Sequence, residues 1–591
     1  MRLRYWAAAA LPLLAFSGCL LPSFKNVDEP AVAGGAGLGG GSGAAGSEPL
    51  AGEGGEAGSA ALAPVDDVFS MLQGRTLKVP APGVLENDAG SSLSVSVTDD
   101  TDTQRPKKYD ATSLLIDADG SLTFKPQADF FGVYTIEYTV RDKDGLTATA
   151  NVKVHVQPVK AQLATVRDGI GGFVIDGAAN DALGTALAAA GDVNHDGFDD
   201  ILLGAPTAGS KGAGRAYVVY GRAKSAKVTL RALAAKSTER TFFDFDGADG
   251  DGAGNSVAGI GDLDGDGFSD FAVAASAAAP AGSVYVLYGG ALSGGIALSA
   301  LGAERGVTLT GDTSPIGALI SRAGDVNGDG TPDLLVSGSA DNGRVYAVLG
   351  SSTLMPAVID ALPSLLKIDG DAQNEALPQS MDTVGHVTTD RRDEVVLGSL
   401  VAVTMLNGTK GAYPTRDGSE VSTDGSRNGW RYALTNNVAP AVAVAGAGNV
   451  DGDAAGTDDV LICETRDAEL QCRVVFGPPV LLNDGWTFTG FSQLPTVTHG
   501  ADLSGDGFSD LLLGDGPAAY VVFGKRSGHA PVDVTALGDA GVSFTTEAGQ
   551  AVDSVATVGD VNGDGIADYA IGVSTANTGT GSVYVIFGDK Y

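Results

Sequence analysis

Basic residues are scarce in this chain of 591 residues, which has 37 Lys and Arg against 72 Asp and Glu and a formal net charge of -35. Phosphate backbones repel such a polyanion, so nucleic acid is excluded as a partner. The five histidines are scattered, and none has zinc-type spacing or a nucleophile motif beside it. The sequence therefore does not predict an enzyme.

Long apolar runs are also missing: no apolar segment reaches the roughly 18 residues that a membrane-spanning helix needs, so the sequence predicts no membrane span. Glycine is abundant instead, with 86 residues, and 43% of the chain is hydrophobic. This composition favours many turns and short strands around a buried core, rather than long helices.

The N-terminus predicts a targeting segment over residues 1–18. Arg2 and Arg4 precede an apolar stretch, and Ser17-Gly18-Cys19 resembles the bacterial lipoprotein cleavage box. We expect lipidation at Cys19, which would attach the protein to a membrane outside the cytoplasm, on the bacterial outer membrane or cell surface. Ordinary secretion, with Cys19 lost in the discarded peptide, is the alternative. Residues 19–64 are mostly Gly, Ala, Ser and Glu, a composition typical of a flexible tether.

Residues 65–158 show period-two alternation, as in the segments 93–97, 134–140 and 152–156, which predicts a β-sandwich. The segments 83–88, 118–126 and 140–145 resemble the cadherin-like or Ig-like modules of large bacterial surface proteins. Such modules usually act as spacers or adhesion units. Asp142 and Asp144 are interpreted as turn-forming residues, with ion binding as the alternative.

One acidic loop recurs with a period near 60 residues, best seen in the segment 191–204. Oxygens at loop positions 1, 3, 5 and 9, with a carbonyl at position 7, converge only if the backbone winds tightly, which Gly at position 6 permits. Hard oxygen ligands without Cys or His favour Ca²⁺, with Mg²⁺ a weaker candidate. Short runs flank each loop, so we expect it to join two strands; solvated acidic turns are the alternative.

Five copies of the loop are clean, and we predict a bound calcium ion in each. The copy at Asn449 has two extra residues and keeps enough oxygens for a weaker site. The copy at His386 survives only as Thr388, Asp390 and Glu394, and Arg391 and Arg392 replace the usual glycine and apolar residue, so we predict no metal there. The predicted metal ligands are Asp192, Asn194, Asp196, Asp200, Asp262, Asp264, Asp266, Asp270, Asp325, Asn327, Asp329, Asp333, Asn449, Asp451, Asp453, Asp459, Asp502, Ser504, Asp506, Asp510, Asp560, Asn562, Asp564 and Asp568.

The number of loop copies gives the number of repeat units in the fold. Seven strands that end in Gly follow the seven loops, and a third class of strand also occurs seven times. The first strand of that class, Phe173 to Gly177, precedes any complete unit, and the last unit lacks its own copy. Pairing the two would close a ring without exposed sheet edges. The predicted fold class is therefore all-β, a seven-bladed β-propeller over residues 160–591 preceded by a small β-sandwich.

These units resemble FG-GAP repeats, the blades of the integrin α-subunit β-propeller. Gly204-Ala205-Pro206 keeps the name-giving tripeptide, whereas Ser337-Gly338-Ser339 and Gly514-Asp515-Gly516 depart from it. The resemblance implies that five to six calcium ions act structurally on one face of the disc, while ligands meet the opposite face.

Cys463 and Cys472 flank a hairpin connection, and we expect a disulfide between them in an oxidising compartment; two free thiols are the alternative. Together the segments predict a surface-tethered calcium-binding lipoprotein that acts in adhesion or binds an unknown protein or glycan. An envelope scaffold without an external ligand and a propeller-type polysaccharide-active enzyme are the alternatives.

Overall fold

A computed structural model of the chain describes residues 62–589 apart from short internal gaps. The predicted signal peptide, Cys19 and most of the predicted tether lie outside the described residues. Within the described part, no helix is both long enough and apolar enough to cross a bilayer. The gaps are 74, 91, 97–113, 127–131, 158–159, 168–170, 223–227, 230–241, 291–294, 313, 340–342, 353, 363–364, 371–375, 388–391, 401, 408–415, 418–428, 434–441, 454–455, 467–468 and 478–484.

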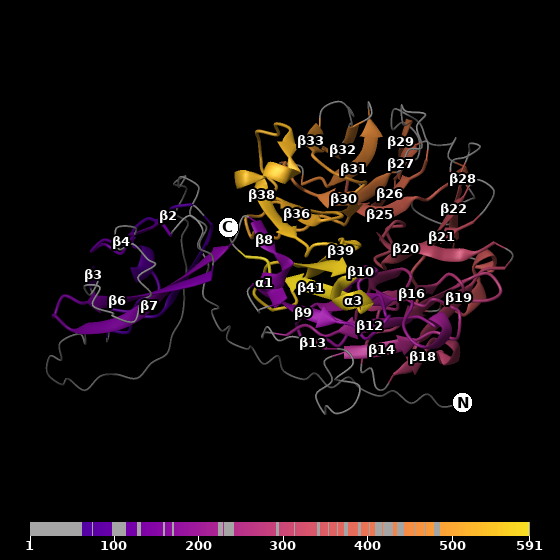
Figure 1. Cartoon of the computed structure of the whole chain (residues 1–591), viewed down its shortest axis with the longest axis horizontal. Helices are drawn as coiled ribbons and strands as arrows, with labels where there is room; N and C mark the ends of the chain where they lie inside the picture. Colours follow the sequence, from indigo (N-terminus) through magenta and orange to yellow (C-terminus); the bar gives the residue numbers. More distant parts are fainter. Residues whose placement is uncertain are drawn as a thin grey trace, which may run out of the picture.

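The first domain consists of two small sheets around one core (Figure 1). Its core includes the fully buried Val84, Ile136 and Val152. Asp142 Oδ1 accepts the N–H groups of Asp144 and Leu146, so it shapes the turn as predicted. One sheet has the order β1 (Asp67–Leu72), β7 (Thr147–Gln157), β6 (Gly132–Arg141), β3 (Ser94–Ser96), and the other has β2 (Leu77–Val79), β5 (Leu122–Phe124), β4 (Leu114–Ile116).

The described residues from 160 onward form seven sheets, which Figure 1 shows side by side in a ring. Their inner strands contact one another in circular order, from the first sheet through the seventh and back to the first. This is the arrangement of a β-propeller, and we number the blades from the first inner strand.

Blades one to three are β10 (Ala186–Gly191), β11 (Asp200–Ala205), β12 (Arg215–Val219), β14 (Phe242–Asp246), β18 (Ile296–Ala297); β15 (Val257–Gly261), β16 (Asp270–Ala275), β17 (Ser283–Leu287), β19 (Gly306–Thr310), β23 (Ala357–Val358); and β20 (Ile316–Gly324), β21 (Asp333–Gly338), β22 (Arg344–Val348), β24 (Leu365–Asp369), β28 (Arg416–Asp417). Blades four and five are β25 (Ser380–Gly385), β26 (Glu394–Gly398), β27 (Ala402–Leu406), β29 (Gly429–Ala433); and β30 (Ala443–Gly448), β31 (Asp459–Arg466), β32 (Glu469–Val475), β33 (Gly485–Thr489), β37 (Val532–Asp533). Blades six and seven are β34 (Thr496–Val497), β35 (Leu511–Asp515), β36 (Ala518–Val522), β38 (Gly541–Thr545), β8 (Lys160–Gln162); and β39 (Ser554–Gly559), β40 (Asp568–Val573), β41 (Ser582–Ile586), β9 (Gly172–Asp176), β13 (Val228–Thr229).

Helical structure in the described residues is limited to single turns. The α-helical turns are α1 (Leu163–Arg167) and α3 (Ala576–Gly579), and the 3-10 turns are η1 (Gly83–Leu85), η3 (Ser210–Gly212), η4 (Leu298–Ala300), η5 (Ile359–Ala361), η7 (Val534–Ala536) and η8 (Gly538–Ala540).

The ring closes through the two ends of the repeat region. The last strand, β41, pairs antiparallel with β9, which comes before the first blade, and Ser582 lies opposite Asp176. This pairing, predicted from the two leftover strands, is confirmed. Most blades also receive a short parallel outer strand from another part of the chain, as β18 pairs with β14. These outer strands cover sheet edges that would otherwise be exposed.

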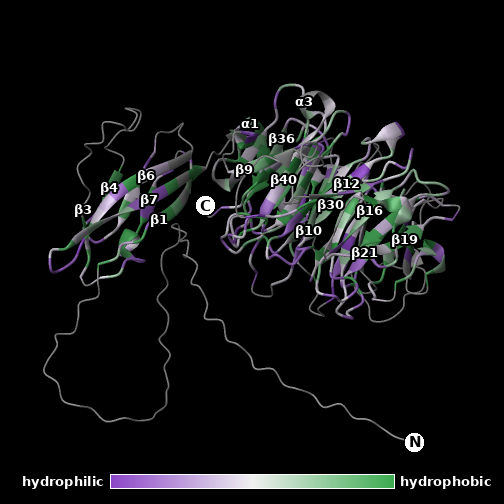
Figure 2. Cartoon of the chain, turned by 90° about the horizontal axis from the view of Figure 1, so that it is seen from below, coloured by the Kyte–Doolittle hydropathy of each residue, from purple (hydrophilic) through white to green (hydrophobic). Residues whose placement is uncertain are grey.

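Residue size follows the geometry of the ring. The second strands β11, β16 and β40 are buried along their whole length, because each blade is covered by a neighbour on both faces. Inner strands such as β10 are rich in Ala and Gly, because the inner strands of neighbouring blades approach each other closely. A Cβ on Gly259 would lie 1.9 Å from the backbone oxygen of Ala189 in the preceding blade. Figure 2 shows hydrophobic residues concentrated in strands of the ring such as β16.

Candidate metal centres

The acidic loops lie between the first and second strands of the blades, as predicted. Tight winding in the five clean copies depends on left-handed glycines at position 6, with φ between 85° and 92°. Position 4 is also left-handed; it is Gly in the other clean loops, but the first loop places His195 there with φ 58°. Backbone conformation therefore directs the oxygens of each loop toward its own centre.

Hydrogen bonds within each clean loop hold the acidic side chains in place. The carboxylate at position 1 accepts the N–H groups of positions 5 and 6; for Asp192 the distances are 3.0 and 2.9 Å. The side chain at position 5 accepts the N–H of position 7, as Asp196 does from Phe198 at 3.1 Å. The Asn449 copy begins in the same way, since Asn449 and Asp451 both accept the N–H of Asp453.

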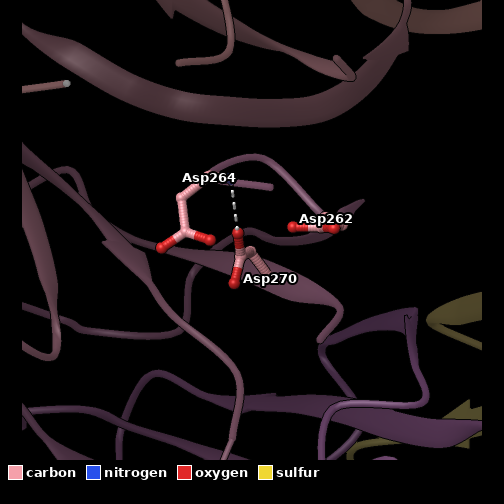
Figure 3. A group of neighbouring side chains, drawn as sticks. All are labelled: Asp262, Asp264 and Asp270. Carbon is pink, nitrogen blue, oxygen red and sulfur yellow. Dashed lines mark hydrogen bonds between the residues drawn. The ribbon is translucent and has the colours of Figure 1, made fainter. Parts of the chain in front are cut away.

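The second loop brings three carboxylates closest together. Ligand oxygens of Asp262, Asp264 and Asp270 all lie within 4.8 Å of one another, and Figure 3 shows the three side chains around a common space. Carboxylate groups at this separation repel one another strongly unless a cation or protons neutralise them. These three residues could hold a divalent ion with oxygen ligands.

The aspartate at position 9 has a second role that the sequence did not suggest. In six blades its Oδ2 accepts the N–H of loop position 2 at 2.9–3.0 Å. Its Oδ1 accepts, at 2.8–3.0 Å, the N–H of the Gly that follows the third strand. The carboxylate therefore connects the loop to the neighbouring strand of its own blade, which explains why both the acid and the Gly recur. These aspartates are Asp200, Asp270, Asp333, Asp459, Asp510 and Asp568.

Burial makes these carboxylates hard to ionise without a cation. It raises the pKa of Asp200 and Asp568 to about 8, and that of Asp270, Asp333 and Asp459 to about 7. The neighbouring loop carboxylates raise these pKa values further, whereas the backbone N–H groups lower them. Asp510 is fully buried, and its pKa is raised well above the usual range. A bound cation would favour the ionised form.

The loop at His386 differs from the others, and Thr388, Asp390 and Arg391 lie outside the described residues. Glu394 is fully buried and accepts the N–H of Val387 at 2.8 Å, so it takes the place of the position-9 aspartate as the acceptor for the N–H of loop position 2. Asp393 lies 3.4 Å from the imidazole of His386. The prediction that this loop holds no metal stays a prediction.

Backbone hydrogen bonds join neighbouring loops at six of the seven junctions around the ring. The N–H at position 8 donates to the carbonyl at position 1 of the preceding blade at 3.0–3.3 Å in six of the seven junctions. At the seventh junction position 8 is Pro332, which has no N–H. Position 8 is acidic in three loops, and these carboxylates (Asp199, Asp393 and Asp458) also accept the N–H of position 1 of the preceding blade. In the sequence these contacts are marked by two consecutive acidic residues at positions 8 and 9 of the loop.

Cys463 and Cys472 lie directly opposite each other on β31 and β32, where a disulfide links them with an S–S distance of 2.03 Å. Both residues are fully buried in the core between blades five and six. The bond joins two adjacent strands of one blade.

The fold and the loops define a class of protein, a β-propeller built from repeats with acidic loops. Residues 183–219, 253–287 and 321–348 match the FG-GAP repeat, and residues 59–155 match a bacterial Ig domain. The chain therefore carries FG-GAP repeats in its ring and a bacterial Ig domain before it. The first matched repeat begins just before β10 and includes the first acidic loop.

Among known proteins, the chain is similar to integrin alpha pat-2 of Caenorhabditis briggsae, at 35% identity over 143 residues. It is also 35% identical over 144 residues to integrin alpha pat-2 of Caenorhabditis elegans. Each alignment covers 23% of this chain and only 9% of the length of the integrin. Among solved structures, a chain of the complex of BBS1N with ARL6DN is similar at 13% identity and a TM-score of 0.29, over 54% of this chain and 75% of that chain. A TM-score this low does not establish a shared fold.

Proposed function

We propose that the acidic loops bind calcium and that the ions stabilise the propeller. The repeated arrangement of oxygens carries this proposal: the same four positions recur in five clean loops, and three of them converge within 4.8 Å in the second. Loops that are joined to each other by backbone hydrogen bonds would repel one another less once the ions neutralise them. Calcium suits these sites because it accepts six to eight oxygen ligands in irregular geometry.

Metal analysis of the purified chain, with thermal unfolding in calcium and in EDTA, tests this proposal. We expect five to six calcium ions per chain, as the intact loop copies in the sequence indicate. A site filled at a hundredfold excess over its Kd adds about 2.7 kcal/mol to the free energy of unfolding, so EDTA should lower the Tm clearly. An unchanged Tm, together with no bound metal, would refute the proposal.

We further propose that the protein is displayed on the outside of a bacterial cell and acts in adhesion or ligand binding. The bacterial Ig domain and the partial similarity to integrin α chains support this role. The lipoprotein-like N-terminus, with lipidation at Cys19, would supply the membrane anchor. The binding partner would be a protein or a glycan.

Two measurements test display and binding separately. Mass spectrometry of the mature N-terminus should find acyl chains on Cys19, and an unmodified chain that begins elsewhere would exclude the anchor. Glycan arrays probed with and without EDTA should show calcium-dependent binding. Turnover of an arrayed glycan to product would favour the enzyme instead, and the absence of binding to arrays and to intact cells would favour a scaffold.

A further inference from the structure

The axis of the propeller contains a cavity of about 860 Å³, lined by the inner strands of all seven blades. This volume lies within the range of about 300–1,000 Å³ that is typical of small-molecule sites. Among the lining residues, Arg322, Asp382 and His499 are the ones with charged or imidazole side chains, and most of the others are small or apolar. None of the three belongs to the acidic loops.

Repeat positions show how this cavity is organised along the axis. The fifth residue before each loop is apolar in every blade, from Leu187 and Val257 to Val497 and Val555, and all seven line the cavity. The third residue before each loop is Ala or Gly in blades one, two and five. In blades three and six the same position holds Arg322 and His499. Arg322 pairs with Leu334 on the neighbouring strand, whereas His499 follows the end of β34 without such a pairing. In both blades the polar residue comes between the apolar position and the loop, so the polar groups form a layer on the loop side of the apolar layer.

The His499 ring packs over Gly446 of the fifth blade, which has no side chain. A Cβ on Gly446 would lie 2.4 Å from His499 Nδ1, so only glycine leaves room for the ring. Nδ1 reaches the backbone oxygen of Thr383 in blade four at 3.3 Å and lies 3.6 Å from Asp382 Oδ2. Two hydrogen bonds fix the Asp382 carboxylate: it accepts the N–H of Gly446 at 3.1 Å and the hydroxyl of Ser321 at 3.3 Å.

These contacts fix the chemistry that His499 offers to the cavity. A carbonyl oxygen only accepts, so Nδ1 carries the hydrogen and the neutral ring has its lone pair on Nε2. Within the described residues, Nε2 has no hydrogen-bond partner. Arg322 is exposed, and among the same residues its guanidinium makes no ion pair or hydrogen bond. The layer thus presents one unpaired cation and one acceptor for a hydroxyl group.

We propose that this cavity binds a small organic acid that also carries hydroxyl groups, the chemical class to which uronic acids belong. Arg322 pairs with the carboxylate, and an Arg–carboxylate contact is charge-assisted and often bidentate. His499 Nε2 accepts a hydrogen bond from a hydroxyl group, and Asp382 and Thr383 hold the imidazole in the required tautomer. The apolar layer contacts the carbon skeleton. This inference is independent of the calcium proposal, because the residues that carry it lie on or beside the inner strands and not in the loops.

Ligand-observed NMR and calorimetry with galacturonate as the probe test the inference on the full chain. The variants are Arg322→Gln and, as a matched control, Arg526→Gln, which replaces an exposed arginine outside the cavity. Galacturonate should bind the wild type and the control equally and bind Arg322→Gln about tenfold more weakly or worse. Galactose, which has the hydroxyl groups without the carboxylate, should bind the wild type as weakly as galacturonate binds the variant.

The imidazole signals of the protein give a second measurement. Galacturonate should shift the ring signals of one histidine among the five, and His499→Gln should remove that signal and weaken binding. The unfolding temperature of each variant shows whether it remains folded. No binding of galacturonate to the wild type, equal binding to Arg322→Gln, equal binding of galactose, or unshifted His499 signals would each overturn the proposal.

Discussion

Replacing Asp270 with Asn separates the two roles assigned to position 9, as a connection within the blade and as a metal ligand. Asp270 accepts the N–H groups of Leu263 at 2.9 Å and of Gly289 at 2.8 Å. Asn keeps one acceptor oxygen, so the variant loses one bond to a charged group and leaves one buried N–H facing an amide NH₂. These two effects together cost about 3 kcal/mol, with or without calcium.

The loss of a ligand adds a cost only when calcium is present. If the variant no longer fills its site at a hundredfold excess of calcium over Kd, it loses about 2.7 kcal/mol more relative to the wild type. The control is Glu394→Gln in the fourth blade, where we predict no metal. Its destabilisation should be the same in calcium and in EDTA, because Glu394 bonds to the N–H of Val387 in both conditions.

Thermal unfolding at pH 8 measures both variants, and metal analysis counts the bound ions. At this pH Asp270 is mostly ionised even without calcium, because its pKa is raised only to about 7. Asp270→Asn should bind one calcium ion fewer than the wild type, whereas Glu394→Gln should bind the same number. If Asp270→Asn keeps every ion and loses equal stability in calcium and EDTA, Asp270 is only a structural connection.

Three further predictions concern pH, packing and the disulfide. Burial raises the pKa of Asp67 in the Ig domain to about 7, so the stability that its protonated form contributes should be lost as pH rises through about 7. The protection factors of the β6 and β7 amides, which are exchange rates corrected for the intrinsic effect of pH, should therefore fall between pH 5 and pH 8 in the wild type but not in Asp67→Asn. Gly259→Ala should destabilise the ring by ~3 kcal/mol, because its Cβ would lie 1.9 Å from a backbone oxygen; a melting temperature equal to that of the wild type would contradict the packing. Cys463→Ser with Cys472→Ser should cost about 2–3 kcal/mol, and reductant should lower the melting temperature of the wild type but not of the double variant.

The sequence was sufficient to predict the all-β fold, the position of the loops and the closure of the ring. These features depend on local signals, namely period-two strands, tight acidic turns and the two strands left over at the ends of the repeat region. Asp142 could also be assigned to a turn, because its hydrogen bonds are to residues two and four positions away. Local chemistry decides such features before any tertiary contact forms.

Features that depend on contacts between distant residues could not be predicted. The partner of Asp200 is the N–H of Gly221, 21 residues along the chain, and the partner of Asp199 is the N–H of Asp560 in the last blade. His499 looks unremarkable in the sequence, because only the ring places it over Gly446 and beside Asp382. Repeat positions mark such residues once the blades are aligned, since a polar side chain then replaces the usual Ala or Gly.

The seven acidic loops are not independent of one another, because main-chain hydrogen bonds connect neighbouring loops around the ring. In six of the seven junctions the N–H at position 8 donates to the first residue of the preceding loop, so the calcium ions that we propose would act on neighbouring loops together. Pro332 interrupts this series between blades two and three, where other hydrogen bonds join the blades, such as the one from the N–H of Ile320 to Ser256 Oγ at 3.0 Å. The two ends of the repeat region meet elsewhere, in blade seven, through β41 and β9, so the missing bond at Pro332 results from the residue type and not from the closure of the ring. If the loops bind calcium as we propose, order should therefore spread from a filled loop to its neighbours on both sides through these backbone bonds, and across the Pro332 junction only through the other contacts between blades two and three.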